Sequence, residues 1–148
     1  MKNLYAILFL GVIVMTVGLI GISIYFGIYY IAPLFKDILD LNISASKWLL
    51  FSLASLVVSG LFMGFFTLSK SMNRNPSIHL SFAVVFSGIS LSIQIYRIIL
   101  NGFAWIGVEI LGNTGDTSIF TTISLLFTIF TLLVFVTNLA LIRRELAG

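Results

Sequence analysis

The sequence contains no cysteine and only one histidine, His79, among its 148 residues. Without cysteine, disulfide-stabilised folds, thiol catalysis and thiolate metal sites are excluded. With one histidine, the chain alone can form neither a bis-histidine haem site nor a histidine cluster for a metal ion. A Ser-His-acid triad is not expected either, because most acidic residues fall at the opposite side of the membrane from His79. We therefore expect no catalytic site, no metal and no cofactor, and a protein that is not an enzyme.

Charged residues are also scarce, and this excludes a water-soluble domain. They make up 9% of the chain, whereas a soluble domain carries roughly 25%. Hydrophobic residues make up 59%, and the mean hydropathy is +1.16. Too few polar side chains remain to cover a water-facing surface. The sequence has no flexible linker, charge block or internal repeat, so we expect a single transmembrane domain over residues 1–148.

What the chain does contain is four long runs without a charged side chain. The first of them, Leu4 to Phe35, is 32 residues long. About 20 apolar residues span a hydrocarbon core of roughly 30 Å, and a charge at its centre is costly, so each run predicts a membrane-spanning helix. We expect an all-α integral membrane protein, a bundle of four transmembrane helices. The expected spans lie near residues 5–31, 48–69, 77–100 and 117–142.

Four spans place both chain termini on the same side of the membrane. That side carries one acidic residue, Glu145, against five basic ones: Lys2, Lys70, Arg74, Arg143 and Arg144. The other side carries Lys36 and Lys47 against four acids, with Arg97 near it. Short loops rich in lysine and arginine stay in the cytoplasm. We therefore expect a multi-pass membrane protein whose termini are both cytoplasmic.

The segment from Ile98 to Asp116, between the third and fourth spans, is too apolar for an ordinary loop. It contains Trp105 and several aliphatic residues, interrupted by four glycines. Backbone that is not helical at membrane depth must be covered by protein or face a cavity. We expect a short interfacial or re-entrant segment here, which is a candidate docking surface.

Small residues recur in the spans and predict where helices pack. Lipid tails are as apolar as leucine, so transmembrane helices associate through close contacts and hydrogen bonds rather than through burial of apolar surface. Glycine and serine allow such close approach. The candidate packing residues are Gly11, Gly18, Gly60, Gly64, Gly88 and Ser92.

The fourth span carries the clearest polar pattern. Thr121, Ser124, Thr128, Thr131 and Asn138 fall on heptad a and d positions, and a 3.5-residue period predicts a left-handed seam along one face. Two interpretations stay open: the seam packs against helices of the same chain, or it lines a polar path or contacts a partner subunit. Serine and threonine hydroxyls can bond to carbonyls of their own helix, so the seam need not contact water.

Gln94 and Arg97 are the polar residues near the outer end of the third span. Three positions apart, they share a helix face and are candidates for the lining of an outer vestibule. A buried arginine at this depth needs water or a partner, so Arg97 either extends to the headgroups, pairs with Glu109 or Asp116, or binds an anionic lipid or cofactor group.

No carboxylate lies in the core of a span, which argues against a self-contained cation-coupled transporter. We expect a non-catalytic subunit of a larger membrane complex of respiratory or transport type. One alternative is a small homo-oligomeric channel or passive transporter, and a second is a structural envelope or membrane-shaping protein. The expected partners are membrane lipids and other membrane subunits or copies of the chain, and no nucleic acid.

Overall fold

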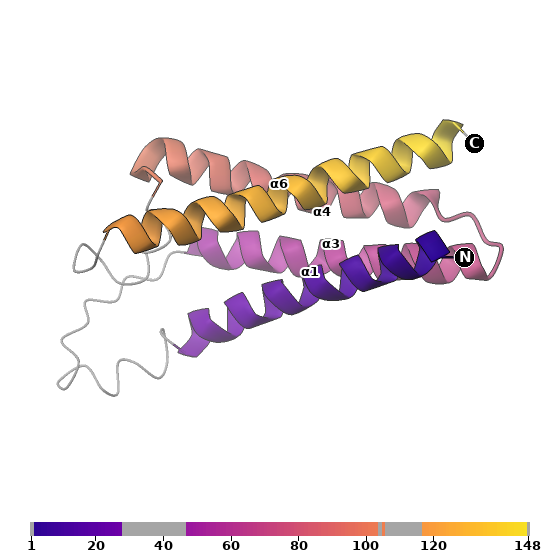
Figure 1. Ribbon diagram of the computed structural model, residues 1–148, viewed down its shortest axis with the longest axis horizontal. Helices are drawn as coiled ribbons and strands as arrows, with labels where there is room; N and C mark the ends of the chain where they lie inside the picture. Colours follow the sequence, from indigo (N-terminus) through magenta and orange to yellow (C-terminus); the bar gives the residue numbers. More distant parts are fainter. Residues whose placement is uncertain (1, 28–46, 104, 106–116, 148) are drawn as a thin grey trace.

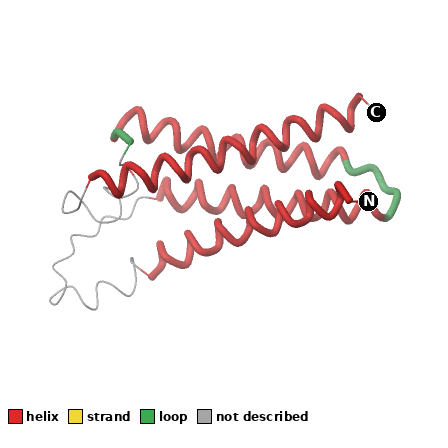
Figure 2. The backbone as a smooth tube through the Cα atoms, viewed as in Figure 1, coloured by secondary structure: helices red, strands yellow, loops and turns green. Residues whose placement is uncertain are grey.

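The computed structural model describes residues 2–27, 47–103, 105 and 117–147, and their regular secondary structure is entirely helical (Figure 1, Figure 2). The helices run along the long axis of the molecule. We call the end where α1 begins, α3 ends, α4 begins and α6 ends the terminal end (Figure 1). The four long helices are α1 (Lys2–Phe26), α3 (Lys47–Ser71), α4 (Ser77–Asn101) and α6 (Thr117–Ala147).

All four helices are long and apolar enough to cross a membrane. The apolar stretches are 24 to 27 residues long, which exceeds the roughly 20 that a bilayer requires. Large apolar side chains point outward from every helix, among them Phe9, Phe51, Ile99 and Leu126. Such a surface is unsuited to water and suited to lipid. The chain is therefore a helical protein with the character of a multi-pass membrane protein, as the uncharged runs predict.

Each predicted span falls on one of these helices, and the bounds differ most at the ends of the first and the fourth span. α6 continues to Ala147, five residues beyond the predicted 142, and so includes Arg143 and Arg144. Charged residues extend a helix where it leaves the hydrocarbon for the headgroups. The first helix ends at Phe26, and residues 28–31 of its predicted span lie outside the described residues.

The connection between α3 and α4 is a tight turn with a defined cap. Asn73 adopts a left-handed backbone with φ of 54°. The Arg74 N–H donates to the Ser69 carbonyl at 2.9 Å, and the Asn73 N–H donates to the Lys70 carbonyl at 3.2 Å. This is a Schellman motif, and asparagine tolerates its left-handed position better than most residues. Pro76 then precedes α4, so the turn holds the two helices antiparallel and adjacent.

The helices pack in chain order, α1 along α3, α3 along α4 and α4 along α6. One apolar cluster joins all four helices. A second cluster lies at the opposite end from the termini and includes Trp105, which follows α4. The first cluster contains Val14, Leu56, Met63, Phe66, Leu80, Ala83 and Val134, and the second Tyr25, Leu49, Leu53 and Trp105.

Candidate functional site

The polar seam of α6 faces the interior of the bundle. Ser124, Thr131 and Asn138 each have no exposed surface. The leucines on the other faces of α6, such as Leu126 and Leu133, are exposed. The heptad pattern thus corresponds to a helix whose hydroxyl and amide groups are turned toward α3 and α4.

The first polar cluster is centred on Gln94 and is formed by Ser52, Ser90, Gln94 and Thr131, which we call the Gln94 cluster. The Gln94 Nε2 group donates toward the Thr131 hydroxyl at 2.9 Å and toward the Ser52 and Ser90 hydroxyls at 3.2 Å each. The two serine hydroxyls are 3.0 Å apart, and Ser90 also donates to the Ser52 carbonyl at 2.8 Å. One amide therefore connects α3, α4 and α6.

The second polar cluster lies two helical turns along α6 and is formed by Ser59, Ala83, Ser87 and Asn138, which we call the Asn138 cluster. The Asn138 Nδ2 group donates toward the Ser59 hydroxyl at 3.3 Å, and toward the Ala83 carbonyl and the Ser87 hydroxyl at 3.4 Å. The Ser59 hydroxyl donates across to the Ala83 carbonyl at 2.9 Å. The same three helices are joined a second time.

The amide oxygens of the two clusters have a different environment from the amide nitrogens. Gln94 Oε1 and Asn138 Oδ1 are buried, and no described residue donates a hydrogen bond to either. Both side chains thus act within the described interior as hydrogen-bond donors. A buried carbonyl without a donor carries a free-energy penalty, so part of what the donated bonds contribute is offset.

The remaining polar candidates lie around these clusters. Thr128 is half-buried and its hydroxyl donates to the Ser124 carbonyl of its own helix at 2.8 Å. Thr121 is half-buried two turns closer to the start of α6. Arg97 is half-buried on α4, and Glu109 lies outside the described residues. Of these candidates, the fold brings Gln94 and Thr131 together. Gln94 has no exposed surface, so its side chain faces the bundle interior and not an open vestibule.

Several candidate packing glycines lie where helices come into close contact. A Cβ atom on Gly60 would lie 2.8 Å from the Gly11 carbonyl oxygen, so α1 and α3 touch through their backbones. A Cβ atom on Gly18 would lie 2.4 Å from Val57, also across α1 and α3. On α4, a Cβ atom at Gly88 would approach the Phe135 ring of α6 to 3.2 Å.

Gly64 and Ser92 are placed differently from the other packing candidates. A Cβ atom on Gly64 would have no atom of the described residues within 4 Å, although the Gly64 backbone nitrogen lies opposite Gly11. Ser92 is exposed on α4. The side-chain positions of both residues therefore point to the surroundings of the bundle.

The partners of the α6 seam were not identified as a site from the sequence. Ser52, Ser59, Ser87 and Ser90 are all fully buried. A signal was nevertheless present, because Ser87, Ser90 and Gln94 follow one another at steps of three and four on α4, which is the spacing of one helix face. Matching this stripe with the α6 seam would have pointed to both clusters.

Among the described residues, no group of three His, Cys, Asp or Glu side chains is placed to hold a metal ion. The polar groups that the fold gathers are amides and hydroxyls, which donate and accept hydrogen bonds but do not titrate in the physiological range. Comparison with known proteins found no family model, no curated protein and no solved structure that matches this chain.

Proposed function

We propose that this chain is a small, non-catalytic integral membrane subunit of a larger membrane assembly. The observation that carries the proposal is that the polar side chains inside the bundle form hydrogen bonds between helices of the same chain. Gln94, Thr131 and Asn138 bond to groups on neighbouring helices of the same chain. Polar side chains engaged in this way fix helix positions and leave the outer faces to contact lipid or other transmembrane helices.

The alternative of a small channel or passive transporter receives less support. It was suggested by the threonines and asparagine of the α6 seam together with Gln94. A conducting path requires such groups to face water, and in the described bundle Thr131, Asn138 and Gln94 have no exposed surface. A pore between copies of the chain would need to be lined by other residues.

We further propose that both termini are cytoplasmic and that the segment after α4 is interfacial or re-entrant. The terminal end carries five of the eight basic residues of the chain. At the opposite end, the exposed rings of Trp48 and Tyr96 lie 6.3 Å apart, as expected for a membrane interface. Trp105 is buried against Leu49 and Leu53, which supports a segment that folds back onto the bundle.

The orientation can be tested by labelling intact cells with a membrane-impermeant maleimide. Because the chain has no cysteine, each introduced thiol is the only one. We expect Phe103→Cys, near the end of α4, to react, and Asn73→Cys, in the turn after α3, to react only after the cells are opened. Labelling of Asn73→Cys but not Phe103→Cys in intact cells would place the termini outside.

The subunit proposal is tested by native mass spectrometry of the protein extracted from its own membranes in a mild detergent. We expect a mass that contains other polypeptides in fixed ratio to the 16.3 kDa chain. A mass that is a clean multiple of 16.3 kDa would contradict the proposal and favour a homo-oligomeric channel or shell.

A further inference from the structure

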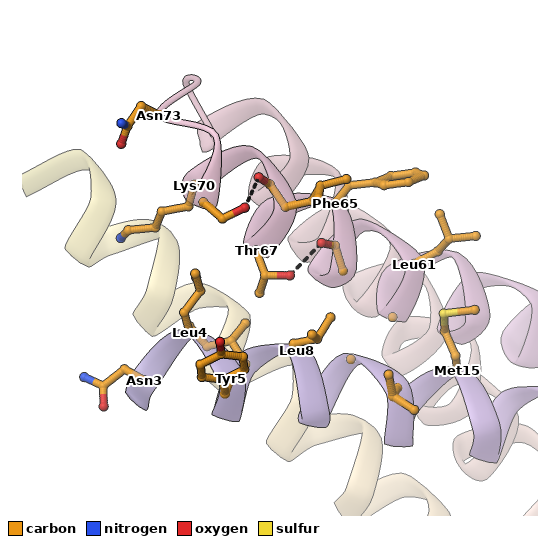
Figure 3. A pocket seen from close by; sticks show the side chains of 17 residues that line it. Asn3, Leu4, Tyr5, Leu8, Met15, Leu61, Phe65, Thr67, Lys70 and Asn73 are labelled. Carbon is orange, nitrogen blue, oxygen red and sulfur yellow. Dashed lines mark hydrogen bonds between the residues drawn. The ribbon is translucent and has the colours of Figure 1, made fainter. Parts of the chain in front are cut away.

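A groove of about 1070 Å³ runs between the first half of α1 and the second half of α3 (Figure 3). In Figure 3, Leu4 and Leu8 of α1 lie on one side of it, and Leu61 and Phe65 of α3 lie on the other. Leu8, Leu61 and Phe65 are exposed, so the groove opens outward from the bundle. Gly64 widens it, because the place where its side chain would lie is empty of described atoms.

The groove has the length of one membrane leaflet. It extends on α1 from Asn3 to Met15, and twelve residues of helix rise about 18 Å. Half of a hydrocarbon core of roughly 30 Å is about 15 Å. The groove ends where α1 and α3 meet, since a Cβ atom on Gly60 would lie 2.8 Å from both the Gly11 oxygen and the Met15 nitrogen. Gly60 is near the middle of α3, hence near the middle of the membrane.

The two ends of the groove differ in polarity. Its terminal end is lined by Asn3, Lys70 and Asn73, whereas Met15 lies at the closed end (Figure 3). Lys70 is ion-paired with Glu145 of α6, but an ammonium group has three protons and can donate to a second anion. The terminal end as a whole carries five basic residues against one acidic residue, Glu145. Its charge is therefore complementary to an anionic headgroup.

We infer that this groove binds one anionic phospholipid, with an acyl chain between α1 and α3 and the headgroup phosphate beside Lys70. The length favours this occupant over a helix of a partner protein, because a spanning helix would need a groove that crosses both leaflets. The polarity favours it as well, because the basic end lies at headgroup depth and the apolar part at acyl-chain depth. The inference goes beyond the proposed function and does not depend on it.

The acyl-chain part of the site is tested with Gly64→Leu, whose Cβ atom would enter open space and whose larger side chain would occupy part of the groove. The matched control is Ser92→Leu, which adds the same side chain at an exposed position of α4 outside the groove. The full chain is reconstituted with phosphatidylglycerol or with phosphatidylcholine of the same acyl chains, and bound lipid is counted by native mass spectrometry.

We expect one retained phosphatidylglycerol per chain, weaker retention of phosphatidylcholine, loss of the bound lipid in Gly64→Leu, and no loss in Ser92→Leu. Equal retention of the two lipids, or equal loss in both variants, would overturn the inference. So would a dimer of the chain that Gly64→Leu dissociates, because the groove would then be a contact between helices of two copies.

The headgroup part is tested with two variants that break the same ion pair. Lys70→Gln removes the cation, and Glu145→Gln removes its intramolecular partner and leaves Lys70 available. We expect phosphatidylglycerol affinity to fall about fivefold in Lys70→Gln, the effect of one lysine near an anionic headgroup, and to stay the same or rise in Glu145→Gln. A similar fall in both variants would overturn the inference, since only the ion pair would then matter. This comparison also decides the matter if Gly64→Leu fails to fold.

Discussion

Gln94 and Asn138 place one side-chain amide each where α3, α4 and α6 meet, and the two amides differ in their hydrogen-bond distances. The Gln94 nitrogen lies 2.9 to 3.2 Å from its three hydroxyl acceptors, whereas the Asn138 nitrogen lies 3.3 to 3.4 Å from its acceptors. Hydrogen bonds weaken toward the long end of this range. At the scale of single residues, Gln94 is therefore the stronger link between the helices.

Replacing Gln94 by methionine should lower the free energy of unfolding by about 1 kcal/mol. The substitution keeps the shape of the side chain and removes its donors. Hydrogen bonds between transmembrane helices contribute about 0.6 kcal/mol on average and up to about 1.7 kcal/mol. The measurement is an unfolding titration of the reconstituted protein in a denaturing detergent.

The matched control is Thr137→Val on α6. The Thr137 hydroxyl donates only to the Leu133 carbonyl of its own helix, at 2.7 Å, so its removal separates no pair of helices. We expect a change in unfolding free energy well below that of Gln94→Met. Equal losses in the two variants would show that the Gln94 cluster does not hold the helices together.

In each polar cluster, the residues on α6 can be predicted from the sequence more readily than their partners on α3 and α4. Thr131 and Asn138 could be predicted, because the hydroxyl and amide side chains of α6 repeat on one face. Their partners on α3 and α4 could not be selected in this way, because serine is frequent in both helices. Ser92 and Ser87 have the same side chain, but one is exposed and the other buried. Only the rotation of α4 against its neighbours distinguishes them.

At the scale of elements, the contact between α1 and α3 depends on glycine. Gly11 and Gly60 face each other with no side chain between the two backbones, and Gly18 faces Val57 two turns further along α1. Such close approach maximises dispersion contacts where no hydrophobic effect acts between helices. α3 and α4, in contrast, are joined by hydroxyl groups such as those of Ser59 and Ser90.

Gly60→Ala should destabilise the protein by about 1–3 kcal/mol, the usual cost of overpacking, because the new methyl group meets backbone atoms of Gly11 and Met15 that cannot move separately. Gly64→Ala, four residues further on the same helix, should leave stability unchanged or raise it by up to about 1 kcal/mol, since its methyl group meets open space and alanine favours the helix. Thermal unfolding of both variants measures the difference, and equal destabilisation would contradict the contact described.

The sequence predicts the helix that carries Gly60 and Gly64, but it does not distinguish the roles of the two glycines. Both belong to one Gly-x-x-x-Gly pair, and the pattern alone suggests equal roles. In the structure, the side-chain position of Gly60 faces the backbone of α1, whereas that of Gly64 faces the groove. Hydropathy also locates the four helices but not their ends, because a helix can continue through charged residues, as α6 does through Arg143 and Arg144.

At the scale of the whole molecule, the described bundle buries its polar clusters beside an apolar core and exposes apolar side chains on its outside. The Gln94 and Asn138 clusters have no exposed surface, and Leu126, Leu133 and Ile99 cover the outside. A water-soluble protein has the opposite arrangement at its surface, whereas lipid favours this one. We therefore propose that the polar seam of α6 holds the helices together and is not a path for water or ions.

Cysteine accessibility in lipid nanodiscs tests this consequence most directly, because the native chain has no cysteine and both membrane faces are open to the reagent. Single variants Thr131→Cys and Ser87→Cys place a thiol in the Gln94 and Asn138 clusters, and Asn73→Cys places one in the exposed turn after α3. With a charged methanethiosulfonate reagent, we expect rapid modification at position 73 and none at positions 87 and 131. Modification of Thr131→Cys at a rate close to that of Asn73→Cys would contradict a dry seam and show that it faces water.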